Sequence, residues 1–127
     1  MDADVIVVGA GPVGLLLAAE LQLGGARAVV VERLTTPSAE TKARGIGALA
    51  TEALWRRGLG PRLAEVHRAG MRDFARDHGG TLGHFANIHK LVPDPERQGT
   101  YIWQPELERL LAAHAEALGV PVQRGRR

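Results

Sequence analysis

The fold of this chain is decided by the stretch Val5-Ile6-Val7-Val8-Gly9-Ala10-Gly11-Pro12-Val13-Gly14. Its first four residues are apolar and β-branched and run into glycine, which predicts a short strand covered on both faces. Pro12 suits the first turn of a helix, where its missing N–H costs nothing. The residues from Val13 to Leu23 are almost all apolar. We therefore expect a largely buried helix after the strand.

The residues that follow complete a strand–helix–strand unit. Gly24 and Gly25 end the helix, as glycine commonly does after a last helical turn. Ala28–Val31 is a second apolar run and predicts a second buried strand, which closes on Glu32. This order predicts an α/β fold that contains a Rossmann-like βαβ unit.

The turn between strand and helix has the glycine spacing G-x-G-x-x-G. Gly9 permits the tight turn, Gly11 lets a pyrophosphate approach the backbone, and Gly14 lets helix and strand pack closely. The helix N-terminus then presents N–H groups to the phosphates. Glu32 lies 18 residues beyond Gly14, close to the spacing of about 20 residues expected for an acid that binds the ribose. Its charge would repel a 2′-phosphate, which argues against NADP. The alternative is a glycine-rich turn in another α/β protein with a chance acid after the second strand.

At this point the chain resembles the class A flavin-dependent aromatic hydroxylases of the para-hydroxybenzoate hydroxylase type, with the polyketide-tailoring hydroxylases as the nearest branch. The resemblance covers the chain end to end but only the N-terminal third or less of a typical member. It implies FAD as the cofactor, NAD(P)H as a transient reductant and a small aromatic or polyketide substrate for the complete enzyme. It rests on four segments in the same order: Val5–Leu15, Val29–Arg33, Thr51–Leu59 and Gln104–Glu108.

The resemblance also implies roles for individual positions. The glycine turn with Val13 would hold the pyrophosphate, Glu32 the adenosine ribose, and Arg33 would lie beside the adenine. A basic residue of the next loop, Lys42 or Arg44, would reach the pyrophosphate, and the choice stays open. The alternative for both is a solvated loop charge.

Gln104 would contact the ribityl chain or a phosphate. It occupies an apparent N-cap, where Ser, Thr, Asp or Asn would cap better. A longer amide there suggests reach towards a ligand, and an indifferent cap is the alternative.

The chain departs from the family pattern in three features. Many members have an arginine at the position of Leu49. Full members also carry an Asp-Gly and a Gly-Asp motif further on, the second of which binds the flavin ribityl, and this sequence has neither dipeptide. No catalytic acid, base or nucleophile is expected in this part of the family, and we identify none. The histidines show no metal-ligand spacing, so no metal site is expected.

The rest of the chain predicts further helices and strands with weaker patterns. We find no internal boundary and expect one FAD-binding domain over 1–127, truncated after its last predicted helix and strand. The expected elements are a loop at 33–47, a helix at about Ala48 to Arg57, a turn of helix at Leu63–His67, one or two strands around Phe74 and Phe85–Leu91, a helix from Pro105 stopped by Gly119 and Pro121, and the start of a strand at Val120–Gln123.

Composition excludes several classes of protein. The sequence has no cysteine, so it has no disulfide or thiolate chemistry. No run approaches the roughly 18 apolar residues of a membrane span, and we expect a cytoplasmic protein. The net charge is +2, with Arg124, Arg126 and Arg127 at the end of the chain. A basic end suits nucleic acid or membranes, but a solvated terminus is the simpler interpretation, and we expect neither partner.

Three hypotheses follow. The first is an FAD-binding module of an NAD(P)H-dependent aromatic or polyketide monooxygenase. The second is a non-catalytic flavin-binding fragment that needs or binds a partner chain or a second copy. The third is a fragment of an NAD-binding oxidoreductase, which Glu32-Arg33 and the Gln104 segment disfavour.

Overall fold

The computed structural model describes residues 2–78 and 99–126, and these form two compact units. The first unit combines residues 1–42 with 103–127, and the second comprises residues 43–102. The strands and helices follow in the order β1 (Val5–Val8), α1 (Pro12–Leu23), β2 (Ala28–Glu32), β3 (Gly45–Ile46), α2 (Ala48–Arg56), α3 (Gly60–His78), β4 (Thr100–Tyr101), α4 (Gln104–Ala117) and β5 (Val122–Arg124).

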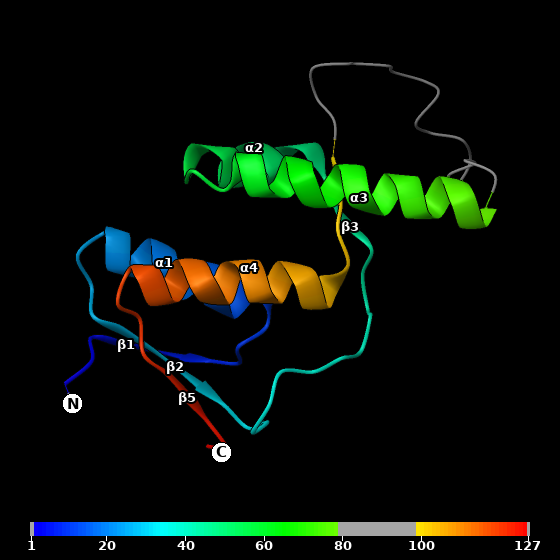
Figure 1. Ribbon diagram of the computed structural model, residues 1–127. Helices are drawn as coiled ribbons and strands as arrows, with labels where there is room; N and C mark the ends of the chain where they lie inside the picture. Colours follow the sequence, from blue (N-terminus) through cyan, green and yellow to red (C-terminus); the bar gives the residue numbers. More distant parts are fainter. Residues whose placement is uncertain (1, 79–98, 127) are drawn as a thin grey trace. The chain divides into compact units, whose positions relative to one another are not determined.

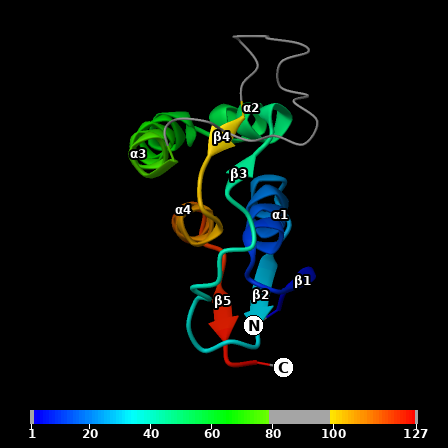
Figure 2. The same cartoon turned by 90° about the vertical axis from the view of Figure 1, so that its right-hand side faces the viewer.

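The first unit is a parallel sheet in the order β1-β2-β5 with α1 and α4 on one face (Figure 1). The view in Figure 2 shows the same arrangement of two helices over the strands. Val7 of β1 and Val30 of β2 are paired in register and point into the core, where Leu15 of α1 and Leu111 of α4 are also buried. The predicted α/β fold with a βαβ unit is therefore confirmed.

Two carboxylates brace β1 and β2 at opposite ends. Asp4 precedes β1, and both its oxygens accept hydrogen bonds from Arg27, which precedes β2, including one from the Arg27 backbone N–H at 2.8 Å. At the other end Glu32 of β2 accepts a hydrogen bond from the Ala10 N–H, also at 2.8 Å. These contacts hold the register in which Val5 pairs with Ala28.

One expectation about β1 is wrong for the described residues. The all-apolar run predicted a strand covered on both faces, but α1 and α4 cover only one. On the opposite face Ile6 is 64% exposed and Val8 is 85% exposed.

The second unit is held together by contacts to the short strand β4. The Thr51 hydroxyl of α2 lies 2.9 Å from the Thr100 hydroxyl, and the backbone N–H of Tyr101 donates to Nδ1 of His67 on α3 at 2.8 Å. The predicted helix at Ala48 to Arg57 is confirmed as α2, and Gly58 follows with a positive φ of 78°.

The structure corrects the sequence prediction for α3. A single helical turn was expected at Leu63–His67 and a strand around Phe74, but one helix of 19 residues includes both. Gly70 leaves room for the ring of Tyr101, and Phe74, one turn further on, lies with its ring centre 6.1 Å from that ring. The strand expected at Phe85–Leu91 lies outside the described residues.

Candidate functional site

The candidate site lies at the carboxyl end of the parallel strands, where β1 runs into the glycine turn. Gly9 has φ +107°, a conformation that side chains rarely adopt. A Cβ on Gly14 would overlap the carbonyl oxygen of Gly9, so this glycine is needed for α1 to pack against the turn. The structure thus supplies reasons within the protein for two of the three glycines.

For Gly11 the fold itself gives no reason for a glycine. It is the N-cap of α1 with φ −78° and ψ −179°, an extended conformation open to any residue. A Cβ placed on it would meet no atom within 4 Å. Neither conformation nor packing in the described chain therefore requires glycine here. A ligand that approaches the backbone closely would require it.

The N-terminus of α1 has hydrogen-bond donors for such a ligand. No side chain caps it. The Leu15 N–H donates to the Gly11 carbonyl at 3.0 Å, so the N–H groups of Val13 and Gly14 lie in the turn before the helical ladder begins. Pro12 lacks an N–H. These donors, together with the positive end of the helix dipole, suit a phosphate.

Glu32 bridges the two loops at this end of the sheet. One carboxylate oxygen accepts from the Ala10 N–H, and the other accepts from the Leu34 N–H, each at 2.8 Å. The backbone N–H groups of Leu34 and Ala10 lower the pKa of Glu32 below its ordinary value, and the Leu34 N–H has the larger effect. The carboxyl group is therefore ionised at neutral pH. A carboxylate has about four lone-pair positions, and Glu32 keeps capacity for ribose hydroxyls after accepting both bonds.

Arg124 was not predicted as part of this end of the sheet. It was assigned to a solvated basic terminus, but it lies in β5 directly opposite Glu32 in the strand register and contributes to the lowered pKa of that carboxylate. The signal was present in the sequence, because the strand expected at Val120–Gln123 needed only one further residue to reach it.

Further nucleotide contacts were predicted for Arg33 and for either Lys42 or Arg44. Arg33 is exposed and follows β2 immediately. Lys42 is exposed and its ammonium lies 3.9 Å from Glu40. Arg44 belongs to the second unit, where its backbone carbonyl accepts from the Ile102 N–H. The choice between Lys42 and Arg44 stays a prediction.

Gln104 needs a correction. It was expected at the N-cap of its helix, but Trp103 is the N-cap and Gln104 is the first residue of α4. Its side-chain amide donates to Glu108 at 2.9 Å, a contact one helical turn along. The N-cap argument for reach towards a ligand therefore fails. The prediction for Gln104 then rests on where its helix begins. α1 and α4 lie side by side and begin at the same end of the sheet (Figure 1).

No metal centre is found in the described ranges, where no three acidic or histidine side chains gather in a way that could hold an ion. His67 accepts the backbone bond from Tyr101. His114 is half-buried on α4, and its Nε2 is buried without a hydrogen-bond partner. Outside residues 79–98, no helix is long and apolar enough to cross a membrane.

Comparison with known proteins agrees with this geometry. Residues 2–127 match the model of a family described as an FAD binding domain. The chain is 40% identical over 130 residues to a rifampicin monooxygenase of Streptomyces venezuelae, which covers 97% of the chain and 25% of the relative. It is 38% identical over 129 residues to a 12-dehydrotetracycline 5-monooxygenase/anhydrotetracycline 6-monooxygenase of Streptomyces rimosus, covering 98% of the chain and 24% of that protein.

The chain belongs to the FAD-binding domain family. The anhydrotetracycline hydroxylase OxyS of Streptomyces rimosus has a similar structure, with a TM-score of 0.75 and 35% identity over 98% of this chain and 24% of that one. The resemblance to aromatic and polyketide hydroxylases is thereby confirmed, and FAD is the cofactor of this domain type. The chain spans about a quarter of the length of these relatives.

Proposed function

We propose that this chain holds the adenosine diphosphate half of FAD for an NAD(P)H-dependent monooxygenase that acts on an aromatic or polyketide small molecule. The observation that carries the proposal is Gly11, a glycine with ordinary backbone angles and open space where its Cβ would be. Glu32 supports it, because an ionised carboxylate with spare lone pairs lies across the same turn.

When bound, the flavin supplies the oxygen chemistry of such an enzyme. The residues of this chain bind and orient the nucleotide. The N–H groups at the start of α1 would hold the pyrophosphate, and Glu32 would accept from the ribose hydroxyls. Arg33, Gln104 and either Lys42 or Arg44 would add the contacts that the family resemblance implies. A cytoplasmic location is part of the same proposal.

A non-catalytic flavin-binding fragment is the second candidate. The observation in its favour is that the family model matched by residues 2–127 is described by FAD binding alone. In this case the same turn would hold FAD, but the chain alone would turn over nothing. The two candidates therefore share the binding site and differ in activity.

Titration of the purified chain with FAD, ADP and FMN, followed by calorimetry, tests the binding step. FAD and ADP should bind at one shared site, and FMN, which lacks the adenosine half, should not compete. If the folded chain binds neither FAD nor ADP, the proposal is wrong. Oxygen uptake driven by NADH or NADPH in the FAD-loaded protein would support the enzyme, and its absence would favour the fragment.

A further inference from the structure

Arg124 and Glu32 lie side by side on β5 and β2. They are paired in the parallel register, two residues beyond the pair formed by Val30 and Val122. Val30 is fully buried in the core beneath the helices. Because side chains alternate between the two faces of a strand, Glu32 and Arg124 start from the same face as Val30. Both therefore lie on the face that α1 and α4 cover, at the end of the sheet where these helices begin (Figure 1).

The backbone on either side of Arg124 is held in place. Arg124 is the last residue of β5 and is half-buried. Just beyond it, the Gly125 N–H donates to the Leu34 carbonyl at 3.3 Å, and the Arg126 N–H donates to the Glu32 carbonyl at 2.9 Å. The base of the Arg124 side chain is therefore fixed beside Glu32, in contrast to the solvated terminus that the sequence predicted.

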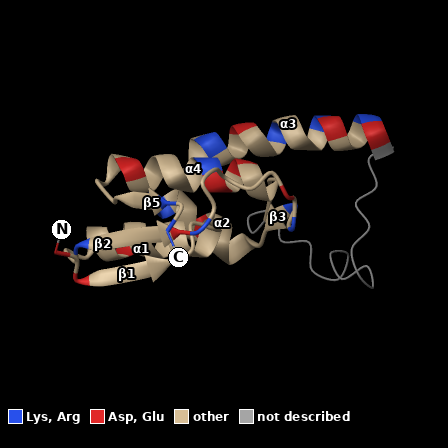
Figure 3. Ribbon diagram, turned by 90° about the horizontal axis from the view of Figure 1, so that it is seen from below, with Lys and Arg blue, Asp and Glu red and all other residues tan. Residues whose placement is uncertain are grey.

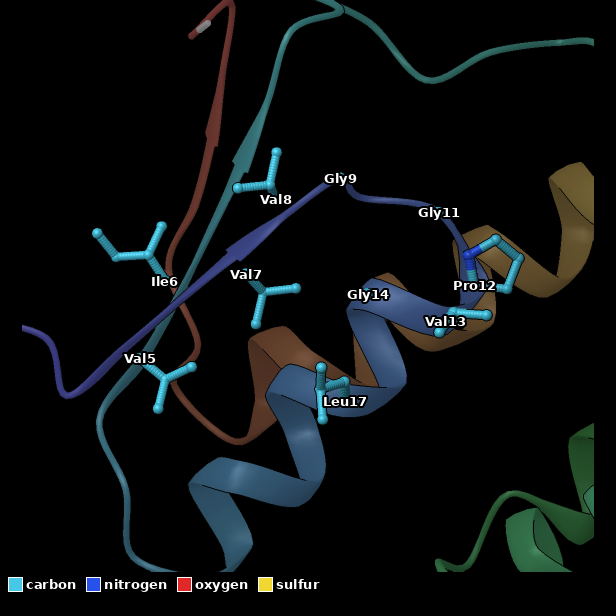
Figure 4. A pocket seen from close by; sticks show the side chains of 10 residues that line it. All are labelled: Val5, Ile6, Val7, Val8, Gly9, Gly11, Pro12, Val13, Gly14 and Leu17. Atoms are coloured by element: carbon cyan, nitrogen blue, oxygen red, sulfur yellow. The ribbon is translucent and has the colours of Figure 1, made fainter.

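The Glu32 carboxylate brings a negative charge to the nucleotide turn. One of its oxygens lies 2.8 Å from the nitrogen of Ala10, which stands between Gly9 and Gly11. Figure 4 shows this turn leading from β1 into α1. A pyrophosphate held at the same turn is also negatively charged, and like charges at one site repel each other. The site can hold both charges more easily if a cation lies beside the carboxylate.

The turn brings no such cation of its own. Residues 5–15 contain no Lys or Arg, and Figure 3 shows β1 and α1 almost free of charge along their length. Arg33 is exposed and acts on the pKa of Glu32 through its backbone N–H. The positive charge that lowers the pKa of Glu32 comes from Arg124. The cation beside this carboxylate is therefore supplied by β5.

We propose that Arg124 is a positioning residue of the nucleotide site. Its guanidinium balances the charge of the Glu32 carboxylate, so that Glu32 can bridge to the glycine turn and accept from the ribose without repelling the pyrophosphate. The proposal rests on the proposed function, and it adds a residue that lies outside the four segments of the family resemblance.

The first test follows the Glu32 carboxyl by NMR during a pH titration of the chain without nucleotide. Its signal is identified by its loss in Glu32→Gln. The pKa of Glu32 should rise towards its ordinary value in Arg124→Gln and return in Arg124→Lys, which restores the charge. Arg126→Gln is the matched control, because it removes an equal charge two residues away and keeps the backbone bond to Glu32. It should leave the pKa of Glu32 unchanged.

The second test measures the Kd for ADP by calorimetry in the same variants. Arg124→Gln should weaken ADP binding about fivefold at low salt, the size expected for one partly exposed charge pair. This difference should fall below about twofold in roughly 0.5 M NaCl, because salt screens charges that water can reach. A purely structural effect of the substitution would not depend on salt. Arg124→Lys and Arg126→Gln should bind ADP like the parent chain.

The outcomes separate this role from the proposed function. A parent chain that does not bind ADP would refute both. If the parent binds ADP and Arg124→Gln binds it equally well, or if Arg126→Gln loses as much affinity, the site stands and the role of Arg124 is wrong. Weaker ADP binding with an unchanged Glu32 pKa would show that Arg124 acts on the nucleotide directly, and it would overturn positioning through Glu32.

Discussion

Gly11→Ala offers a direct test of the nucleotide site, because the substitution separates ligand binding from folding. Gly11 has φ −78°, and a methyl group added there would meet no atom within 4 Å, so alanine fits without strain. Alanine is a poorer N-cap than glycine by roughly 1 kcal/mol. It also reduces the entropy of the unfolded chain, which offsets about 0.4–1 kcal/mol. The free energy of unfolding should therefore change by less than about 1 kcal/mol.

Nucleotide affinity should change much more. The methyl group would occupy the space through which a pyrophosphate reaches the backbone, and a lost hydrogen bond to a charged group costs about 1.5–3 kcal/mol. At 1.4 kcal/mol for each factor of ten, this corresponds to a roughly tenfold to hundredfold weaker Kd for FAD and ADP. Calorimetry measures this affinity, and urea unfolding without nucleotide measures stability.

Gly47→Ala is the matched control. Gly47 is the N-cap of α2, with φ −72° and ψ 172°, no side-chain cap and open space where a Cβ would lie. The two glycines are alike in local structure and differ in the ligand proposed for one of them. Gly47→Ala should match Gly11→Ala in stability and leave FAD affinity unchanged. If both variants bind FAD as tightly as the parent chain, the pyrophosphate does not approach Gly11 and the reasoning fails.

Four further predictions concern the packing of Gly14, the hydrogen bonds of Glu32 and Asp4 in the first unit, and one buried contact of the second unit. Gly14→Ala should lower the free energy of unfolding by more than about 2 kcal/mol in urea titrations, because its methyl group would overlap backbone. Glu32 has a lowered pKa in the folded chain, so the stability it contributes is present above about pH 4.3 and is lost as the pH falls through the pKa of the folded state. Glu32→Gln should flatten this part of the pH–stability curve. The same variant should weaken FAD binding. The hydrogen bonds from Arg27 lower the pKa of Asp4 to about 2, so Asp4→Asn should remove the loss of stability between about pH 4 and pH 2, with the Asp4 carboxyl followed by NMR. Thr51→Val leaves the hydroxyl on β4 buried without its partner and should cost about 1–3 kcal/mol, whereas Thr51→Ser should restore most of it.

Local chemistry in the sequence was enough to predict the strand–turn–helix–strand start of the first unit. The β-branched run, the turn glycines and Pro12 each favour the same strand–turn–helix conformation, and Glu32 follows at the expected spacing. The double role of Glu32 was not visible in the sequence. Its bonds to Ala10 and Leu34 depend on two loops that meet only when β1 and β2 pair.

The second unit was harder to predict because its pattern is set by tertiary contacts. Glycine is a poor helix former, so Gly70 weakens the helical pattern of α3. The reason for glycine at this position is visible only in the folded structure, where the ring of Tyr101 lies against it. Gln104 illustrates a different limit. Its helix was expected correctly, but the boundary moved by one residue to Trp103, and the N-cap argument depended on that single position.

The largest difference between sequence and structure is also the most informative about how the domain works. The apolar pattern of β1 predicted a strand covered on both faces, but among the described residues α1 and α4 cover only one face, and Ile6 and Val8 are exposed on the other. The glycine turn is the continuation of that strand, and Glu32 of β2 accepts a hydrogen bond from the Ala10 N–H within the turn. The pairing of β1 with β2 therefore also fixes the position of the turn that is proposed to hold the pyrophosphate.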